Sequence, residues 1–247
     1  MEATVDLSLD ERWCIGGKPH GGYLLREMVR PLLTEAHPHP LAVSAHYLRS
    51  PDPGPATVEH ETLREGRRVS SYRSRLVQGQ TTVEALVTTG SLDPSAAPFW
   101  SSTEMPALPT VEDCFRSEPE TVPGFRVGHL EFVDVRWSKP PNISPETSEG
   151  GFATWMRMDG HEATVLDLMV LCDALPPITM DMGIHGWAPT VELTVLVRGV
   201  PAPGWLVAEQ RGVLLQDGWM DETMTLWDSR GQVVCQARQL AGYRLAG

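Results

Sequence analysis

Two aspartates stand in an apolar stretch of the second half of the sequence. The stretch reads HEATVLDLMVLCDALPPI over residues 161–178. Its apolar residues recur at helical spacing and fill most directions, which predicts one buried helix that ends at Pro176. Asp167 falls near the first turn, where the helix dipole favours an anion, and Asp173 falls in the last turn, where the dipole disfavours one. Asp173 is therefore either a hydrogen-bonded structural residue or a general base with a raised pKa.

A glycine pair near the N-terminus is the second candidate for chemistry. In the run KPHGGYLLREMV, Gly21 and Gly22 open a predicted helix that extends to about Ala36 and that Pro31 kinks or shortens. The free N–H groups at a helix N-terminus bind oxyanions and phosphates. The alternative is that the glycines only permit a turn.

The elements that must position these residues occur twice. The first helix is followed by four predicted strands, which are Ala42–Ser50, Ala56–Glu65, Val69–Gln78 and Thr81–Gly90. Two further predicted strands, Leu130–Trp137 and Gly151–Met158, precede the helix with Asp173. That helix is again followed by four predicted strands, which are Thr190–Arg198, Trp205–Leu215, Trp219–Trp227 and Val233–Tyr243. Each half is thus a helix followed by an antiparallel meander.

The two halves also match residue by residue. The matched pairs, about 150 residues apart, are Arg49 and Arg198, Gly54 and Gly204, Glu59 and Glu209, Ala85 and Ala237, and Gly90 and Gly242. This order predicts an internal duplication, with units at residues 1–92 and 125–247 and a Pro- and Ser-rich linker at 93–124. A functional site would lie between two such units.

Composition excludes several classes of protein. A net charge of −12 argues against a nucleic-acid-binding protein. The sequence has no run of 18 apolar residues and its N-terminus lacks the pattern of a signal peptide, so we expect no membrane segment and a cytoplasmic location. The four cysteines are far apart and form no CxxC pair, which argues against disulfides and a zinc site. We expect no metal.

These features resemble the double-hotdog acyl-CoA thioesterases of the bacterial thioesterase II type. The resemblance rests on PHGGYLLREMV, on the hairpins from AVSAHYLRSPDPG to SRLVQGQ, on the connector MPALPTVEDC and on Ala-Leu-Pro after Asp173. It implies an α+β double hotdog fold, which consists of two tandem hotdog units, each a long helix wrapped by an antiparallel β-sheet. It also implies an acyl-CoA thioesterase of lipid metabolism that needs no cofactor, because CoA enters as part of the substrate.

The same resemblance implies a set of site residues. An Asp, a Thr and a Gln hold and polarise the attacking water in that family, and these fall on Asp173, Thr190 and Gln239. Gln239 lies on the apolar face of its predicted strand and needs a partner there. Thr190 lies on the opposite face, so a bulge near Pro189 would have to turn it toward Asp173.

The run His20-Gly21-Gly22 resembles the turn of single-hotdog thioesterases whose backbone N–H contributes to the oxyanion hole. We expect these three residues to bind the substrate. The matching acid of those proteins is missing from the first helix, where Met28 and Val29 stand.

Other functions remain open from the sequence. A hotdog enoyl-CoA hydratase or dehydratase would need a His close to Asp173, and only His161 and His185 are near it in sequence. A non-catalytic acyl-CoA-binding protein is the second alternative. The arginines Arg64, Arg67, Arg68, Arg73 and Arg75 lie on one predicted hairpin and are either a CoA phosphate site or a solvated sheet face. We expect a homo-oligomer, and the sequence does not specify the acyl chain.

Overall fold

The computed structural model describes residues 2–120, 123–139, 148–184 and 186–244. It has two α-helices, α1 (Gly21–Val29) and α2 (Leu168–Leu171). The strands of the first half are β1 (Glu2–Leu9), β2 (Cys14–Ile15), β3 (Lys18–Pro19), β4 (His39–Tyr47), β5 (Gly54–Arg64), β6 (Val69–Gln78) and β7 (Gln80–Gly90). Those of the second half are β8 (Phe115–Arg116), β9 (Val133–Trp137), β10 (Gly151–Met158), β11 (Thr190–Val197), β12 (Leu206–Gln216), β13 (Trp219–Trp227) and β14 (Val233–Gly242).

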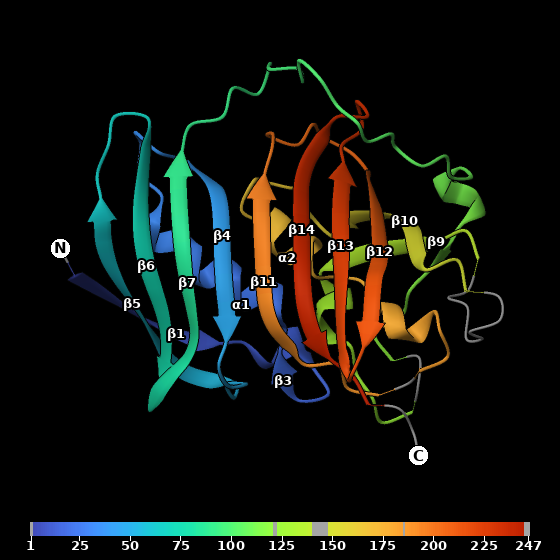
Figure 1. Cartoon of the computed structure of the whole chain (residues 1–247), viewed down its shortest axis with the longest axis horizontal. Helices are drawn as coiled ribbons and strands as arrows, with labels where there is room; N and C mark the ends of the chain where they lie inside the picture. The colour runs from blue at the N-terminus through green and yellow to red at the C-terminus, as the bar shows by residue number, and fades with distance from the viewer. Residues whose placement is uncertain (1, 121–122, 140–147, 185, 245–247) are drawn as a thin grey trace.

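One twelve-stranded sheet runs through both halves (Figure 1). Its order is β1-β5-β6-β7-β4-β11-β14-β13-β12-β10-β9-β8. Strands β4 and β11 pair antiparallel at the centre, where Leu193 lies opposite Ala45. From this central pair outward, the first half has the order β4-β7-β6-β5 and the second half the order β11-β14-β13-β12. The last three strands of each half form a meander, as predicted. The prediction that the first strand of each half pairs with the next one was wrong, because β4 pairs with β7 and β11 with β14, and the halves join edge to edge.

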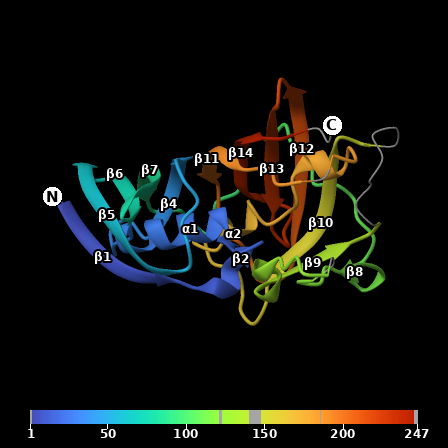
Figure 2. The same ribbon diagram turned by 90° about the horizontal axis from the view of Figure 1, so that it is seen from below.

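The helices lie side by side on one face of the sheet (Figure 2). Apolar residues of both helices, including Met28 and Leu168, are fully buried against inward residues of the strands such as Val43 and Val195. Burial of this kind is the main stabilising contribution to such a fold. The helices run antiparallel, because Gly22 of α1 lies against Met169 and Asp173, whereas Arg26 lies near Asp167.

The prediction of two long helices was wrong. The segment 161–178 contains only one helical turn, the four residues of α2, because Asp167 accepts hydrogen bonds from the backbone N–H and the hydroxyl of Thr164. These local bonds hold a turn in place of a regular first turn of helix. In the first half, α1 ends at Val29 and a 3₁₀ turn over Arg30–Leu32 follows, because Pro31 cannot continue the hydrogen-bond ladder. The fold is nevertheless the hotdog arrangement of helix against antiparallel sheet.

The segment between the halves crosses the top edge of the sheet in Figure 1. From Ser91 to Thr110 it forms no helix or strand. Its first regular elements are the 3₁₀ turn Val111–Asp113 and the short strand β8. The boundaries 1–92, 93–124 and 125–247 stay a prediction. None of the described helices is long and apolar enough to cross a membrane.

Candidate active site

Asp173 sits where the C-terminal end of α2 meets the N-terminus of α1. Its Oδ2 accepts a hydrogen bond of 2.7 Å from the N–H of Gly22. A Cβ added to Gly22 would lie 2.2 Å from the carbonyl oxygen of Met169, so only glycine allows the two helices to approach this closely. We call this contact the Gly22–Asp173 junction. It places a carboxylate at a helix N-terminus, where an anion is stabilised.

Two histidines hold the chain on either side of this carboxylate. His20 accepts the N–H of Tyr23 at Nδ1, so its Nε2 carries the proton and donates to the carbonyl oxygen of Asp173 at 2.8 Å. The ring of His129 packs against that of His20 at an angle of 34° with centroids 4.5 Å apart, and its Nε2 lies 3.0 Å from the carbonyl oxygen of Ala174. Burial lowers the pKa of His20 to about 4 and that of His129 well below its usual range, so both rings are neutral. They position Asp173 through its backbone.

A row of polar side chains crosses the sheet below this junction. Five neighbouring strands contribute one residue each, which are Tyr47 of β4, Thr190 of β11, Gln239 of β14, Glu222 of β13 and Gln210 of β12. We call these residues the polar row. The register of β11 against β14 shifts between Thr190 and Glu192, which is the bulge that the sequence required to turn Thr190 inward.

Hydrogen bonds connect four members of the polar row. Thr190 Oγ1 donates to Gln239 Oε1 at 3.1 Å, and Gln239 Nε2 donates to Glu222 Oε1 at 2.7 Å. The other oxygen of Glu222 accepts from Gln210 Nε2 at 2.8 Å and from the N–H of Ile178 at 2.9 Å. When Glu222 is ionised it only accepts, and the Gln239 amide then has its nitrogen toward Glu222 and its oxygen toward Thr190.

A small cavity lies between the junction and the polar row. It has a volume of about 20 Å³, and its lining includes Asp173, Gln210, Glu222 and Gln239. Polar walls and this volume suit a single water molecule. Predicted residues Asp173 and Gln239 therefore face one space, and Thr190 reaches that space through Gln239.

Both carboxylates of the cavity are hard to ionise. Burial raises the pKa of Asp173 to about 7, and the hydrogen bond from Gly22 partly offsets this effect. Burial likewise raises the pKa of Glu222 to about 7, and the charge of Asp173 adds to the rise. The hydrogen bonds from Ile178, Gln210 and Gln239 lower this pKa and partly offset the effect. A carboxylate with a pKa near neutrality can take and return a proton within one catalytic cycle.

A larger, mainly apolar cavity of about 710 Å³ lies beside the start of β11. Trp187, Pro189, Trp219 and Tyr243 are among its lining residues. This volume falls within the range of small-molecule sites. Its lining includes Pro189 and Val191, which are the chain neighbours of Thr190, and no member of the polar row.

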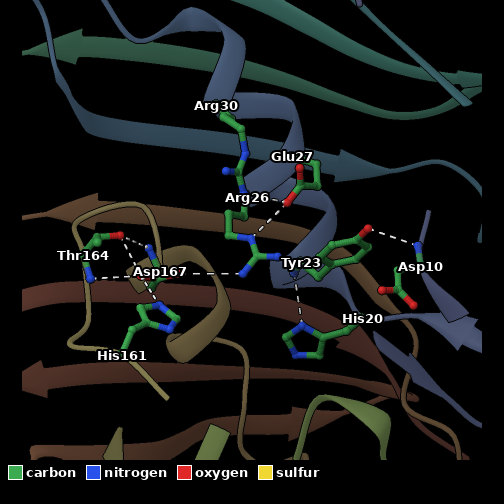
Figure 3. Close-up of polar contacts among 9 residues, drawn as sticks. All are labelled: Asp10, His20, Tyr23, Arg26, Glu27, Arg30, His161, Thr164 and Asp167. Atoms are coloured by element: carbon green, nitrogen blue, oxygen red, sulfur yellow. Dashed lines mark hydrogen bonds and ion pairs between the residues drawn. The ribbon is translucent and has the colours of Figure 1, made fainter. Parts of the chain in front are cut away.

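The opposite contact of the two helices carries an ion pair (Figure 3). Asp167 is 5% exposed, accepts from Thr164 and His161, and lies 3.7 Å from Arg26 Nη1. The Arg26 guanidinium covers the ring of Trp13, with 4.5 Å to the centroid. We call this the Arg26–Asp167 junction. Its carboxylate is surrounded by donors and a cation, which suits a structural role.

Several sequence predictions fall elsewhere in the structure. His20 is buried and both of its ring nitrogens are bound to protein, which favours a positioning role. Substrate binding by His20, Gly21 and Gly22 stays a prediction. His161 lies at Asp167 and not at Asp173, and His185 lies outside the described residues. Arg73 is paired with Glu61 and Glu84 on the hairpin surface, which favours the solvated sheet face over a CoA phosphate site.

Glu222 and His129 were missed from the sequence. Glu222 could have been found, because it alternates with the buried residues Met220, Met224 and Leu226 and is therefore an acid on the apolar face of its strand. Gln239 was selected by the same pattern. His129 lies in the 3₁₀ turn Gly128–Glu131 that precedes β9, and no pattern in the sequence indicates its contact with His20.

Comparisons with known proteins match both halves of the chain. Residues 9–90 match a family model described as the N-terminal domain of acyl-CoA thioesterase, and residues 102–243 match its C-terminal domain. The chain is 34% identical to a Thermobifida fusca protein assigned as a thioesterase II, with a TM-score of 0.87 and coverage of 98% of this chain and 92% of that chain. It is 32% identical over 257 residues to an uncharacterized protein of Mycobacterium tuberculosis, which covers 94% of this chain and 88% of the relative. A hotdog protein of Alicyclobacillus acidocaldarius, 20% identical, superposes with a TM-score of 0.83 and coverage of 99% and 94%.

Proposed function

Because this chain belongs to the acyl-CoA thioesterase family and is thus a thioester hydrolase, we propose that it hydrolyses an acyl-CoA with Asp173 as the general base. The observation that carries this proposal is the position of Asp173. Its carboxylate lies at a helix N-terminus and lines a cavity that fits one water. A raised pKa suits this carboxylate to accept the proton of that water.

The proposed reaction has two proton transfers. The water oxygen attacks the thioester carbon while Asp173 takes its proton, and a tetrahedral oxyanion forms. The C–S bond then breaks, the sulfur leaves with the bonding electrons, and protonated Asp173 returns the proton to it. The products are a carboxylic acid and CoA, and no cofactor takes part.

The polar row holds the attacking water in this proposal. Gln239 uses its oxygen for Thr190 and one N–H for Glu222. Its second N–H and the second lone pair of its oxygen remain for the water in the cavity. Thr190 thus fixes the amide that binds the water, and Glu222 fixes the same amide from the other side.

We further infer that the two halves are tandem units of a double hotdog. The same strand order on either side of the β4–β11 pair supports this interpretation. Three further properties of the protein stay predictions, which are a role in lipid metabolism, a cytoplasmic location and a homo-oligomeric state. Light scattering after gel filtration would measure the number of subunits directly.

Release of free thiol from a panel of acyl-CoAs tests the proposed function. The panel should include short, long, branched and aromatic acyl groups, because the apolar cavity beside β11 has room for each class. We expect the purified protein to release thiol at a rate that saturates as the substrate concentration rises. Binding of acyl-CoA by calorimetry without any release would support a non-catalytic binding protein instead.

The rate of hydrolysis should depend on the ionisation of Asp173. We expect kcat/KM to rise with pH through a midpoint near the pKa of about 7 and to level off when the carboxylate is fully charged. Among its neighbours, His20 stays neutral and the raised pKa of Tyr47 keeps its phenol protonated, so only Glu222 titrates in the same range. The two carboxylates therefore titrate as a coupled pair, which broadens the rise of kcat/KM on the acid side of the pH profile, the acid limb.

A pH series of kcat/KM from about 5 to about 9 measures this limb. The Glu222→Gln protein serves as the control, because the second titration should disappear and the limb should become steeper. A rate that is already maximal at the lowest pH would contradict the assignment of Asp173 as a base of raised pKa.

A further inference from the structure

We propose that the hydroxyl of Tyr47 donates a hydrogen bond to the carbonyl oxygen of the thioester and stabilises the oxyanion that forms on it. This inference rests on the proposed function and adds to it a residue that contacts the reacting atoms. It also accounts for a donor that has no acceptor among the residues that the structure describes.

Tyr47 ends β4 at the centre of the sheet. Val43 and Ala45 precede it at alternate positions and are fully buried, so Tyr47 continues the face that packs against the helices. Its neighbour His46 lies opposite Glu192 of β11. Tyr47 therefore stands beside Thr190 in the polar row, on the strand that comes from the other half of the chain.

Gly21 shows how close Tyr47 is to the base. A Cβ added to Gly21 would lie 2.8 Å from Asp173 Oδ2 and 3.2 Å from Tyr47 Oη. Both oxygens are within contact distance of one point, yet no hydrogen bond joins them. A carbon at that point would be too close to Asp173 Oδ2, so only glycine allows the base and the phenol to lie this close to the start of α1. In this proposal, the thioester carbonyl approaches Asp173 with its oxygen toward the Tyr47 donor and its carbon toward the water at Asp173.

The Tyr47 hydroxyl is buried and has no partner among the described residues. A buried polar group without a hydrogen bond costs free energy, so its retention calls for a reason. Tyr23 shows the ordinary situation, because its hydroxyl accepts the N–H of Asp10 at 3.1 Å. An acceptor supplied by the substrate would satisfy Tyr47 only during catalysis.

The protonation state of Tyr47 agrees with a donor role. Burial raises the pKa of its phenol well above 10, and the charge of Asp173 adds to the rise. Tyr47 therefore keeps its proton at neutral pH and cannot serve as a base. A neutral donor in a buried site stabilises a developing oxyanion strongly, because little water competes for it.

The test compares Tyr47→Phe with the matched control Tyr23→Phe. We expect Tyr47→Phe to lower kcat by a factor of about 10 to 100 with KM changed by less than about threefold, since the bond strengthens as the oxyanion forms. Its melting temperature should equal or exceed that of the wild type, because an unsatisfied hydroxyl is removed. Tyr23→Phe should show the reverse, with a lower melting temperature and nearly unchanged kcat.

The pH profile separates this role from a bond to Asp173. If Tyr47 acts on the carbonyl oxygen, its removal lowers the plateau and leaves the midpoint of the acid limb in place. A shifted midpoint would show that the hydroxyl stabilises the Asp173 carboxylate and would overturn the inference, as would a kcat within twofold of the wild type. Failure of the proposed function has a different signature, which is no thiol release by the wild type.

Discussion

Replacement of Asp173 by asparagine is expected to lower kcat for acyl-CoA hydrolysis on the order of 10³-fold while the protein stays folded. The asparagine oxygen can accept the N–H of Gly22 in place of the carboxylate, so the Gly22–Asp173 junction keeps its hydrogen bond. The amide cannot take a proton from water, and so the reaction loses its general base. Thiol release at saturating substrate measures the effect.

The change in stability that Asp173→Asn causes can be predicted from the pKa of Asp173. Asp173 has a folded-state pKa of about 7 against an ordinary value of 3.8, so the folded state binds its proton more tightly than the unfolded state. The free energy of unfolding therefore falls as pH rises from about 4 to about 7, where Asp173 becomes charged. Asparagine carries no charge, and at pH about 8 the Asp173→Asn protein should melt no lower than the wild type.

Asp167→Asn is the matched control for this experiment. Asp167 is also buried and lies at the same helix pair, but its partners are Thr164, His161 and Arg26. We expect its replacement to lower the melting temperature and to leave kcat within a few-fold of the wild type. If Asp173→Asn kept its activity or Asp167→Asn lost it, the base would have been assigned to the wrong junction.

The second large effect is expected for Glu222→Gln, with kcat lower by about 10²-fold, because the water at Gln239 would be misplaced. The N–H of Ile178 cannot turn away, so the new side chain must present its oxygen there and its NH₂ to Gln239. Gln239 must then rotate its oxygen toward residue 222 and its nitrogen toward Thr190. The oxygen and nitrogen of the Gln239 amide thus exchange places, and its second N–H no longer points toward the water.

The double variant Glu222→Gln with Gln239→Glu distinguishes this effect from a loss of stability. All the hydrogen bonds of the polar row can form again, because the glutamate at 239 accepts from both Thr190 and the new glutamine. We expect the melting temperature to recover relative to Glu222→Gln and kcat to stay low. Recovery of kcat would show that the second N–H of Gln239 has no part in the reaction.

The sequence predicted the strands better than the helices. Strands β6, β10 and β13 begin and end where alternation placed them. The helix at 161–178 was overestimated because apolar residues in every direction fit a buried turn as well as a buried helix. The bonds of Asp167 to Thr164 decided between the two, and they depend on side-chain geometry that periodicity does not contain.

The sequence identified those residues of the candidate site that differ in polarity from their sequence neighbours. Asp173 and Gln239 are polar groups in apolar patterns, and the sequence alone selected them. Tyr47 could not be selected, because a tyrosine at the end of a strand is ordinary. Only its unpartnered hydroxyl and its place beside Gly21 distinguish it.

The antiparallel pairing of β4 with β11 places both helix junctions within one polypeptide. If two identical units were joined in this way, both helix junctions would have the same residues. Two halves within one chain do not have this requirement, since each junction is encoded separately. In the described residues, one junction carries the proposed base Asp173 and the other the Arg26–Asp167 ion pair. Active-site titration should therefore count one site per polypeptide, whatever the number of chains in the assembly.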